Sequence, residues 1–126
     1  MKGRLAMVLF VFSFVSCANV QVFHGVASDA LYFGTQIPAG GVVSDAEWQQ
    51  FLADVITPRF PDGFTTWEAN GQWRDQKGVI EHERTHIVQI VRPDEVKIRE
   101  IVDLYKKQFH QEAVMCVSSD VRLAFR

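Results

Sequence analysis

The spacing of hydrophobic and polar residues changes several times along the chain, and each change predicts where an element starts or ends. Residues 30–37 are rich in β-forming side chains and stop at a cluster of Pro, Ala and Gly over 38–41, which predicts a first strand. Residues 64–74 and 79–92 are rich in aromatic and β-branched side chains. They predict two further strands, with a turn between them at 75–78.

Two segments instead carry the 3.6-residue period of a helix with one apolar face. The first begins at Ser44, which forms a capping box with Glu47, and we expect it to end at Thr57 because Pro58 disfavours helical geometry in the residue before it. The second begins after Pro93 and ends in a basic turn that suits the negative end of a helix. The apolar faces consist of Trp48, Phe51, Leu52, Val55 and Ile56 in the first helix and of Ile98, Ile101, Val102, Tyr105 and Phe109 in the second.

Two details of the strands leave alternatives open. Residues 113–117 and 121–125 predict a last strand that could be broken at 118–120. Asn70-Gly71 could be a tight hairpin turn, but a bulge at Gly71 leaves middle strands of better-matched length. We favour the bulge.

The predicted order of elements, β-α-β-β-α-β, is that of the α+β ferredoxin-like sandwich. In this fold a four-stranded antiparallel sheet carries two helices on one face, and the other face meets solvent, a ligand or a second subunit. A chain of 126 residues suits about one such domain, which we place at residues 30–126. The chain has 13 Lys and Arg against 15 Asp and Glu and no long basic stripe, so we expect no nucleic-acid partner.

The N-terminal region has the composition of an export signal. Lys2 and Arg4 precede an apolar stretch over residues 5–15, interrupted only by Ser13, which is shorter than the roughly 20 residues of a membrane-spanning helix. The pattern predicts a signal peptide over residues 1–17 and a location in the bacterial cell envelope. A buried strand with the same apolar composition is the alternative.

The end of this region, Phe-Val-Ser-Cys at residues 14–17, resembles a bacterial lipobox and predicts lipidation of Cys17. Ordinary secretory cleavage after Ala18, giving a periplasmic or secreted protein, is the alternative. Residues 18–29 have no strong periodicity and are expected to form a tether. With Cys17 lipidated, Cys116 has no intramolecular disulfide partner, and its apolar surroundings in the sequence predict a small buried side chain.

One motif matches the signature of zinc peptidases, in which two histidines four residues apart bind zinc and a glutamate activates the zinc-bound water. It consists of His82, Glu83 and His86. The chemistry requires a helix, because four residues rise only roughly 6 Å along a helix but span roughly 13 Å along a strand. The motif lies in the β-branched segment 79–91, so we expect exposed histidines on a strand and no metal site or cofactor.

Several aromatic and basic residues could instead line a pocket on or beside the open face of the sheet. Aromatic rings supply surface in such pockets, and arginines bind carboxylate or phosphate groups. The alternative is that the tryptophans belong to the core or to a dimer interface and that the arginines form surface ion pairs. The candidates are Tyr32, Arg59, Trp67, Trp73 and Arg74. A turn at Gly40-Gly41 could present N–H groups to an anion but lacks the spacing and lysine of a phosphate-binding loop.

A series of short motifs runs through the predicted domain: Leu31-Tyr32-Phe33-Gly34, Gly41-Val42-Val43-Ser44 leading to Trp48, Thr57-Pro58-Arg59-Phe60-Pro61-Asp62-Gly63, and Gly71-Gln72-Trp73-Arg74 followed by Glu83. In these motifs the chain resembles the bacterial family known as the domain of unknown function 3574. The resemblance implies an exported protein with a ferredoxin-like fold, and it places residues 79–91 on a strand. It implies no activity, substrate or cofactor.

Three functional classes remain after these observations. The first, which we favour, is a non-enzymatic envelope protein that binds a small molecule or a protein partner and forms a homodimer through the exposed sheet face. The second is a dimeric ferredoxin-like enzyme of the monooxygenase or isomerase type, which is an analogy of fold alone. The third is a zinc hydrolase that uses His82, Glu83 and His86.

Overall fold

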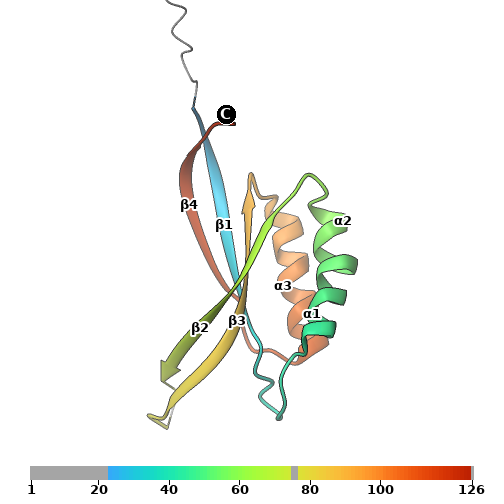
Figure 1. Cartoon of the computed structure of the whole chain (residues 1–126), viewed down its shortest axis with the longest axis vertical. Helices are drawn as coiled ribbons and strands as arrows, with labels where there is room; N and C mark the ends of the chain where they lie inside the picture. Colours follow the sequence, from blue (N-terminus) through green and yellow to red (C-terminus); the bar gives the residue numbers. More distant parts are fainter. Residues whose placement is uncertain (1–22, 75–76, 126) are drawn as a thin grey trace, which may run out of the picture.

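The computed structural model describes residues 23–74 and 77–125, and it has the predicted order of strands and helices (Figure 1). The four strands form one antiparallel sheet in the order β2-β3-β1-β4, which is the ferredoxin-like order. The predicted fold class is therefore confirmed. The elements are β1 (His24–Gly34), α1 (Asp45–Phe51), a π-helical segment η1 (Leu52–Ile56), α2 (Thr57–Arg59), β2 (Thr65–Arg74), β3 (Ile80–Val91), α3 (Glu95–Phe109) and β4 (Met115–Leu123).

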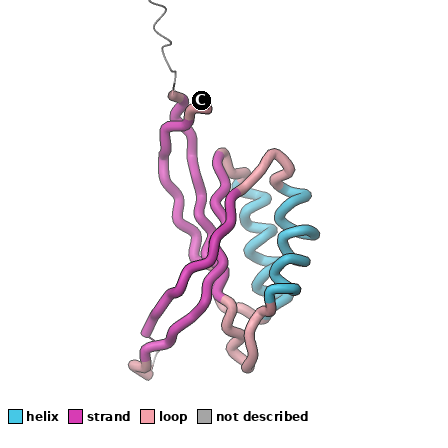
Figure 2. Tube along the Cα trace, in the orientation of Figure 1, coloured by secondary structure: helices cyan, strands magenta, loops and turns pink. Residues whose placement is uncertain are grey.

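The helices of the described residues all lie on one side of the sheet, and none of them covers its other side (Figure 2). The sheet is longer than the helix layer: the β2–β3 hairpin extends past the helices at one end, and β1 and β4 extend past them at the other (Figure 1). Consequently β2 has exposed side chains on both of its faces.

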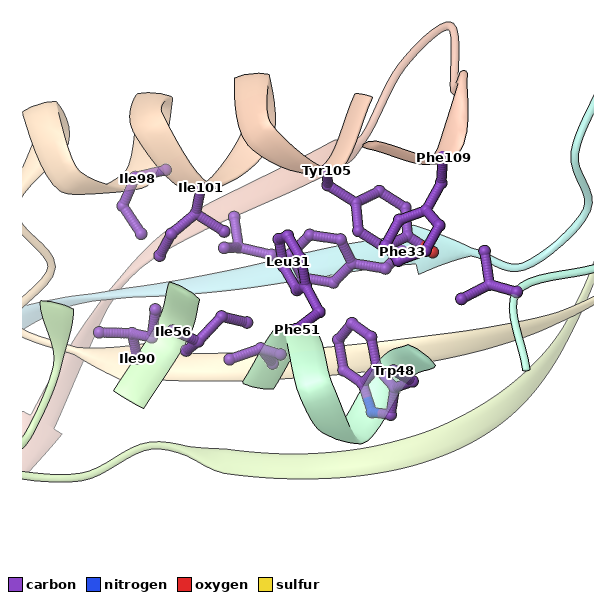
Figure 3. Packing of buried hydrophobic residues seen from close by; sticks show 12 residues of the cluster. Leu31, Phe33, Trp48, Phe51, Ile56, Ile90, Ile98, Ile101, Tyr105 and Phe109 are labelled. Atoms are coloured by element: carbon purple, nitrogen blue, oxygen red, sulfur yellow. The ribbon is translucent and has the colours of Figure 1, made fainter. Parts of the chain in front are cut away.

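A cluster of aromatic rings fills the space between the sheet and the helices (Figure 3). Phe33 of β1 lies at its centre, with its ring centroid 4.8 Å from that of Tyr105 and 5.3 Å from that of Trp48. Phe51 and Phe109 extend the cluster along the helices. Burial of each such ring stabilises the fold by about 1.5–3 kcal/mol, so this cluster is a principal reason why the two layers stay together.

The first helix begins as predicted, because Ser44 and Glu47 form both hydrogen bonds of the capping box. Its predicted end at Thr57 was wrong, since helical geometry continues to Arg59. In a regular α-helix the ring of Pro58 would clash with the carbonyl four residues earlier. The backbone avoids this by widening to a π-helical turn, in which the N–H of Thr57 donates to the carbonyl of Leu52.

Strand β1 begins at His24, six residues before the predicted position, so the expected tether over residues 18–29 was wrong for its last six residues. These residues pair with β4, from His24 opposite Leu123 to Asp29 opposite Ser118. The predicted signal peptide and Cys17 lie outside the described residues. Within residues 23–74 and 77–125, no helix has the length and apolar character needed to cross a bilayer.

The register of the β2–β3 hairpin contradicts the predicted bulge. Every residue of β2, from Thr65 opposite Gln89 to Arg74 opposite Ile80, has one partner on β3. Gly71 therefore sits in a regular ladder and not in a bulge. The alternative of a tight hairpin turn at Asn70-Gly71 is also wrong, because β2 continues to Arg74 and β3 begins at Ile80. The last strand is likewise unbroken from Met115 to Leu123, because its polar centre pairs with β1.

Candidate functional site: a groove on the open face of the sheet

Alternation along the strands decides which side chains face away from the helices. We call this side the open face. Tyr32 of β1 and Trp67 of β2 both pair with Ile87 of β3, so these three side chains point to the same side. Val117 of β4 points there as well, because it lies two residues after Met115, the partner of Tyr32. Ile87 is buried there, whereas Trp67 is 42% exposed. The open face therefore presents large apolar side chains to the surroundings.

One end of the open face is hollowed into a groove of about 850 Å³. Its walls come from β1, the loop after β1, the β2–β3 hairpin and the segment that leads into β4. Aromatic, acidic and thioether side chains line it, including Tyr32, Trp73, Glu81, Glu83, Glu112 and Met115. The groove thus combines flat apolar walls with several carboxylates.

Glu83 is held in a fixed position within this groove. Its Oε1 accepts a hydrogen bond from the backbone N–H of Gln36 at 2.9 Å, and the side chain of Gln36 donates to the carbonyl of His82 at 2.8 Å. The carboxylate lies over Gly34, where an added Cβ would come within 2.5 Å of Oε1. Glycine at position 34 therefore makes room for the Glu83 carboxylate.

The backbone beneath Glu83 is tied to the core and to the neighbouring strand. The hydroxyl of Tyr105 donates to the carbonyl of Gly34 at 2.8 Å, and Thr35 donates to the carbonyl of Arg84 through both its N–H and its hydroxyl. Burial, followed by the charges of Glu83 and Glu47, raises the pKa of Tyr105, so this hydroxyl stays protonated as a donor. The part of the groove floor around Gly34 and Thr35 is consequently tied to the folded core.

The apparent zinc motif lies on strand β3, as predicted. His82 and His86 share one side of the strand and Glu83 points to the other, since side chains alternate along a strand. His82 is exposed, whereas His86 is only 3% exposed, which corrects the prediction that both histidines face solvent. The three residues do not have the helical geometry of a zinc peptidase, so the zinc hydrolase is not supported.

The buried His86 stacks on Trp48, with ring centroids 4.4 Å apart and an interplanar angle of 3°. Among residues 23–74 and 77–125 its Nε2 has no hydrogen-bond partner, and its Nδ1 lies 3.7 Å from Glu68. Burial lowers the pKa of His86, and the charge of Arg84 lowers it further, against the opposing effect of Glu68 and Asp45. The imidazole is therefore neutral at pH 7 and serves as a core residue.

Asp45, Glu68 and His86 bring potential metal-ligand atoms within 4.8 Å of one another, on the helix side of the sheet. Arg84 already supplies a cation there, because its guanidinium lies 2.6 Å from Asp45 and 3.6 Å from Glu68. This charge opposes binding of a metal cation. We therefore interpret the group as an ion-pair network that covers the edge of the core.

The five pocket residues suggested by the sequence do not form one site. Tyr32 and Trp73 line the groove, whereas Trp67 lies on the open face outside it. Arg59 belongs to the helix layer, where it contacts Glu100 at 3.0 Å and donates to the carbonyl of Val55. Arg74 ends β2 with its side chain on the opposite side of the strand from Trp73.

Two weaker candidates also have structural explanations. Gly40 and Gly41 have positive φ angles in a tight turn, with the N–H of Gly40 donating to the carbonyl of Ile37. The helix that follows starts with acidic residues, which would repel an anion. Cys116 was predicted to be buried, but it is exposed on β4 because the helices do not extend over this edge strand.

Comparison with known proteins assigns the sequence to a family model. The model described as "Protein of unknown function (DUF3574)" matches residues 28–125. No curated protein matches the chain.

Several solved structures share the fold. A phage SAM lyase in complex with S-methyl-5'-thioadenosine is 13% identical with a TM-score of 0.57, and the similarity covers 79% of this chain and 90% of the lyase. A phage SAM lyase in the apo state is also 13% identical, with a TM-score of 0.54 over 80% and 89% of the two chains. CutA from Synechococcus elongatus PCC7942 is 11% identical, with a TM-score of 0.54 over 82% and 83%. At these identities the likeness shows the ferredoxin-like fold alone.

Proposed function

This chain belongs to the DUF3574 family of proteins of unknown function, and we propose from its own structure that the domain binds a small organic molecule in the open-face groove. The supporting observation is the groove itself. Its volume of about 850 Å³ suits a small molecule, and Tyr32 and Trp73 supply flat surfaces beside the polar groups of Glu81 and Glu83. The core supports the β1 side of the groove through the Tyr105–Gly34 hydrogen bond, whereas Trp73 and Glu81 belong to the part of the β2–β3 hairpin that extends past the helices.

We favour binding without catalysis. A ferredoxin-like monooxygenase or isomerase that encloses its substrate between sheet and helices needs space in that layer. The described core instead has rings in contact there, with the centroids of Phe51 and Tyr105 5.1 Å apart and those of Tyr105 and Phe109 4.8 Å apart. A phage lyase of the same fold is described in complex with S-methyl-5'-thioadenosine, a small molecule with a flat base, and this supports ligand binding by analogy of fold.

A homodimer through the open face is part of the same proposal. Trp67, Val91 and Val117 are exposed apolar side chains on this face outside the groove. Burial of such a surface against a second copy would remove apolar area from water. Size-exclusion chromatography with light scattering tests this: we expect a dimer that Trp67→Glu converts to a monomer, and a strictly monomeric parent protein contradicts it.

We also propose that the protein is exported and attached to the bacterial envelope through Cys17. Support comes from the charged start, the apolar stretch and the lipobox-like end of residues 1–17. Metabolic labelling with a fatty-acid analogue should mark the parent protein and leave Cys17→Ser unlabelled. Equal labelling of both, or of neither, contradicts lipidation at this residue.

A thermal-shift screen with two matched variants tests the groove. A ligand present at 100 times its dissociation constant stabilises the folded state by about 2.7 kcal/mol, which raises the melting temperature measurably. Trp73→Ala should abolish the shift, whereas Trp67→Ala should retain it, because both residues lie on the same face of β2 and only Trp73 lines the groove. If Trp67→Ala loses the ligand-induced rise in melting temperature and Trp73→Ala keeps it, the ligand binds elsewhere. The proposal is contradicted if no compound in a screen of nucleosides, aromatic amines and aromatic acids raises the melting temperature.

A further inference from the structure

The charged groups that line the groove all have the same sign. Among the described lining residues these groups are Glu81, Glu83 and Glu112, and no Lys, Arg or His is with them. The whole chain has nearly balanced charges, with 13 Lys and Arg against 15 Asp and Glu. The groove is therefore a local region of negative potential on a nearly neutral molecule.

The walls around these carboxylates are aromatic. The ring faces of Tyr and Trp carry partial negative charge, so they attract a cation that is positioned over them. Tyr32 and Trp73 thus favour the same sign of ligand charge as the carboxylates do. A ligand anion would be repelled by both kinds of group. A neutral ligand could use the aromatic surfaces and the neutral polar groups of Gln36, Thr85 and Gln111, but it would gain nothing from the negative potential.

A bare metal ion fits the groove less well than an organic cation. Among the described residues, the donor atoms that gather within 4.8 Å of one another belong to Asp45, Glu68 and His86, which lie on the other side of the sheet. The groove has instead a volume of about 850 Å³ and apolar walls, which suit a ligand with a carbon skeleton.

Glu83 is the carboxylate best prepared to meet a ligand cation. The N–H of Gln36 donates to its Oε1 at 2.9 Å, and the lack of a side chain at Gly34 leaves room for the carboxylate against the sheet. A carboxylate offers about four lone-pair sites, so this hydrogen bond leaves capacity for a ligand. A group that is already oriented loses little entropy when the ligand binds.

We propose that the groove selects an organic cation, an ammonium or sulfonium group attached to a flat apolar body, with Glu83 as its counter-ion and Trp73 against its body. This inference rests on the proposed function, because it names the class of ligand for the same groove. The three carboxylates, the two aromatic rings and the glycine that accommodates Glu83 all favour this class of ligand.

Three indole compounds of similar shape test the charge preference with the purified protein. Tryptamine carries an ammonium group, tryptophol carries a hydroxyl at the same position, and indole-3-propionate carries a carboxylate. A fragment with about twelve non-hydrogen atoms should reach a dissociation constant on the order of 1 mM. We expect tryptamine to bind about five- to tenfold more tightly than tryptophol, and indole-3-propionate to bind most weakly, as measured by ligand-observed NMR titration.

Two groove variants and one control identify the group responsible. Glu83→Gln keeps an oxygen for the Gln36 N–H but removes this charge, so the preference for tryptamine over tryptophol should fall at least about twofold, while Glu81, Glu112 and the aromatic rings retain part of it. Gly34→Ala keeps the charge and displaces the carboxylate, so it should weaken tryptamine binding and leave tryptophol binding unchanged. Asp120→Asn removes an exposed charge on the opposite side of the sheet and should change neither affinity.

The outcomes separate the two proposals. Equal binding of tryptamine and tryptophol, both lost in Trp73→Ala, would overturn the cation preference and leave the groove as the binding site. The expected dissociation constant is on the order of 1 mM. Absence of binding by all three compounds at concentrations about tenfold higher would overturn both the cation preference and the groove as the binding site. A preference for tryptamine that is unchanged in Glu83→Gln would overturn the assignment of Glu83 as counter-ion.

Discussion

The buried His86 should make the stability of the fold depend on pH in a way that one substitution removes. Burial lowers the pKa of His86 in the folded protein below its ordinary value of 6.5, which applies in the unfolded chain. Below pH 6.5 the unfolded state therefore binds more protons than the folded state, and acid favours unfolding. The stabilising effect of the neutral imidazole is complete above pH 6.5. It is lost as the pH falls toward the lower pKa that His86 has in the folded protein.

The magnitude follows from the linkage between protons and stability. A single group contributes a slope of up to about 1.4 kcal/mol per pH unit in this window. For a domain of this size, each 1 kcal/mol shifts the melting temperature by about 4–8 °C. His86→Phe should keep a flat ring against Trp48 and remove the titrating group, so this part of the slope should disappear.

Urea denaturation at a series of pH values between 5 and 8 measures the effect. His82→Phe is the matched control, because it removes an exposed histidine from the same side of the same strand and should leave the slope unchanged. A His86→Phe protein whose stability varies with pH as steeply as that of the parent would refute the reasoning. A slope lost in His82→Phe instead would show that the buried imidazole is not the source.

Three further experiments test the packing of the core and the surroundings of Cys116. Tyr105→Phe should cost about 1 kcal/mol in urea denaturation, because the carbonyl of Gly34 loses its hydroxyl partner. Trp48→Ala should cost about 3–5 kcal/mol in the same assay, because it removes a buried ring from the core and from the His86 stack. In a Cys17→Ser protein, Cys116 should be alkylated by iodoacetamide more slowly at pH 7.5 than after unfolding, as followed by mass spectrometry. Although the residue is exposed, neighbouring atoms shield its thiol partly from water, and this desolvation, followed by the charges of Asp29 and Glu95, raises the pKa of the thiol and reduces its thiolate fraction.

The elements with strong local signals were predictable from the sequence. The capping box at Ser44 and the β-branched run that ends at Val91 depend on neighbouring residues, and the structure has both where we expected them. The same run excluded the helical geometry that a zinc peptidase needs. Local pattern was therefore sufficient for the order of elements and for the fold class.

Features that depend on distant partners were not predictable in the same way. Residues 24–29 contain glycine and polar side chains and resemble a tether, but their pairing with β4 makes them a strand. The helix continues past Pro58 because the backbone widens to a π-helical turn, for which the sequence contains no simple signal. Cys116 follows an apolar run yet is exposed, because the helix layer ends before the edge strand.

The groove was partly visible in the sequence. Tyr32 and Trp73 were candidates because they are aromatic, but Glu83 drew attention only as part of the zinc motif and of the motifs that resemble the family, and not as a groove residue. Side chains two residues apart on a strand point to the same face. Glu81 and Glu83 lie six and four residues before the apolar Ile87 on β3, so alternation along the strand would have placed both carboxylates on the open face with Ile87. Glu112 belongs to the groove through the long-range return of the chain before β4, which no local pattern indicates.

The position of the ligand is tested most directly by the three tryptophan indoles, each of which gives a separate N–H signal in a spectrum of 15N-labelled protein. Trp73 lines the groove, Trp67 lies outside it on the same face, and Trp48 is in the core. Titration with unlabelled tryptamine should move the Trp73 signal and leave the signals of Trp67 and Trp48 in place. Movement of the Trp67 or Trp48 signal with an unchanged Trp73 signal would contradict the groove as the binding site.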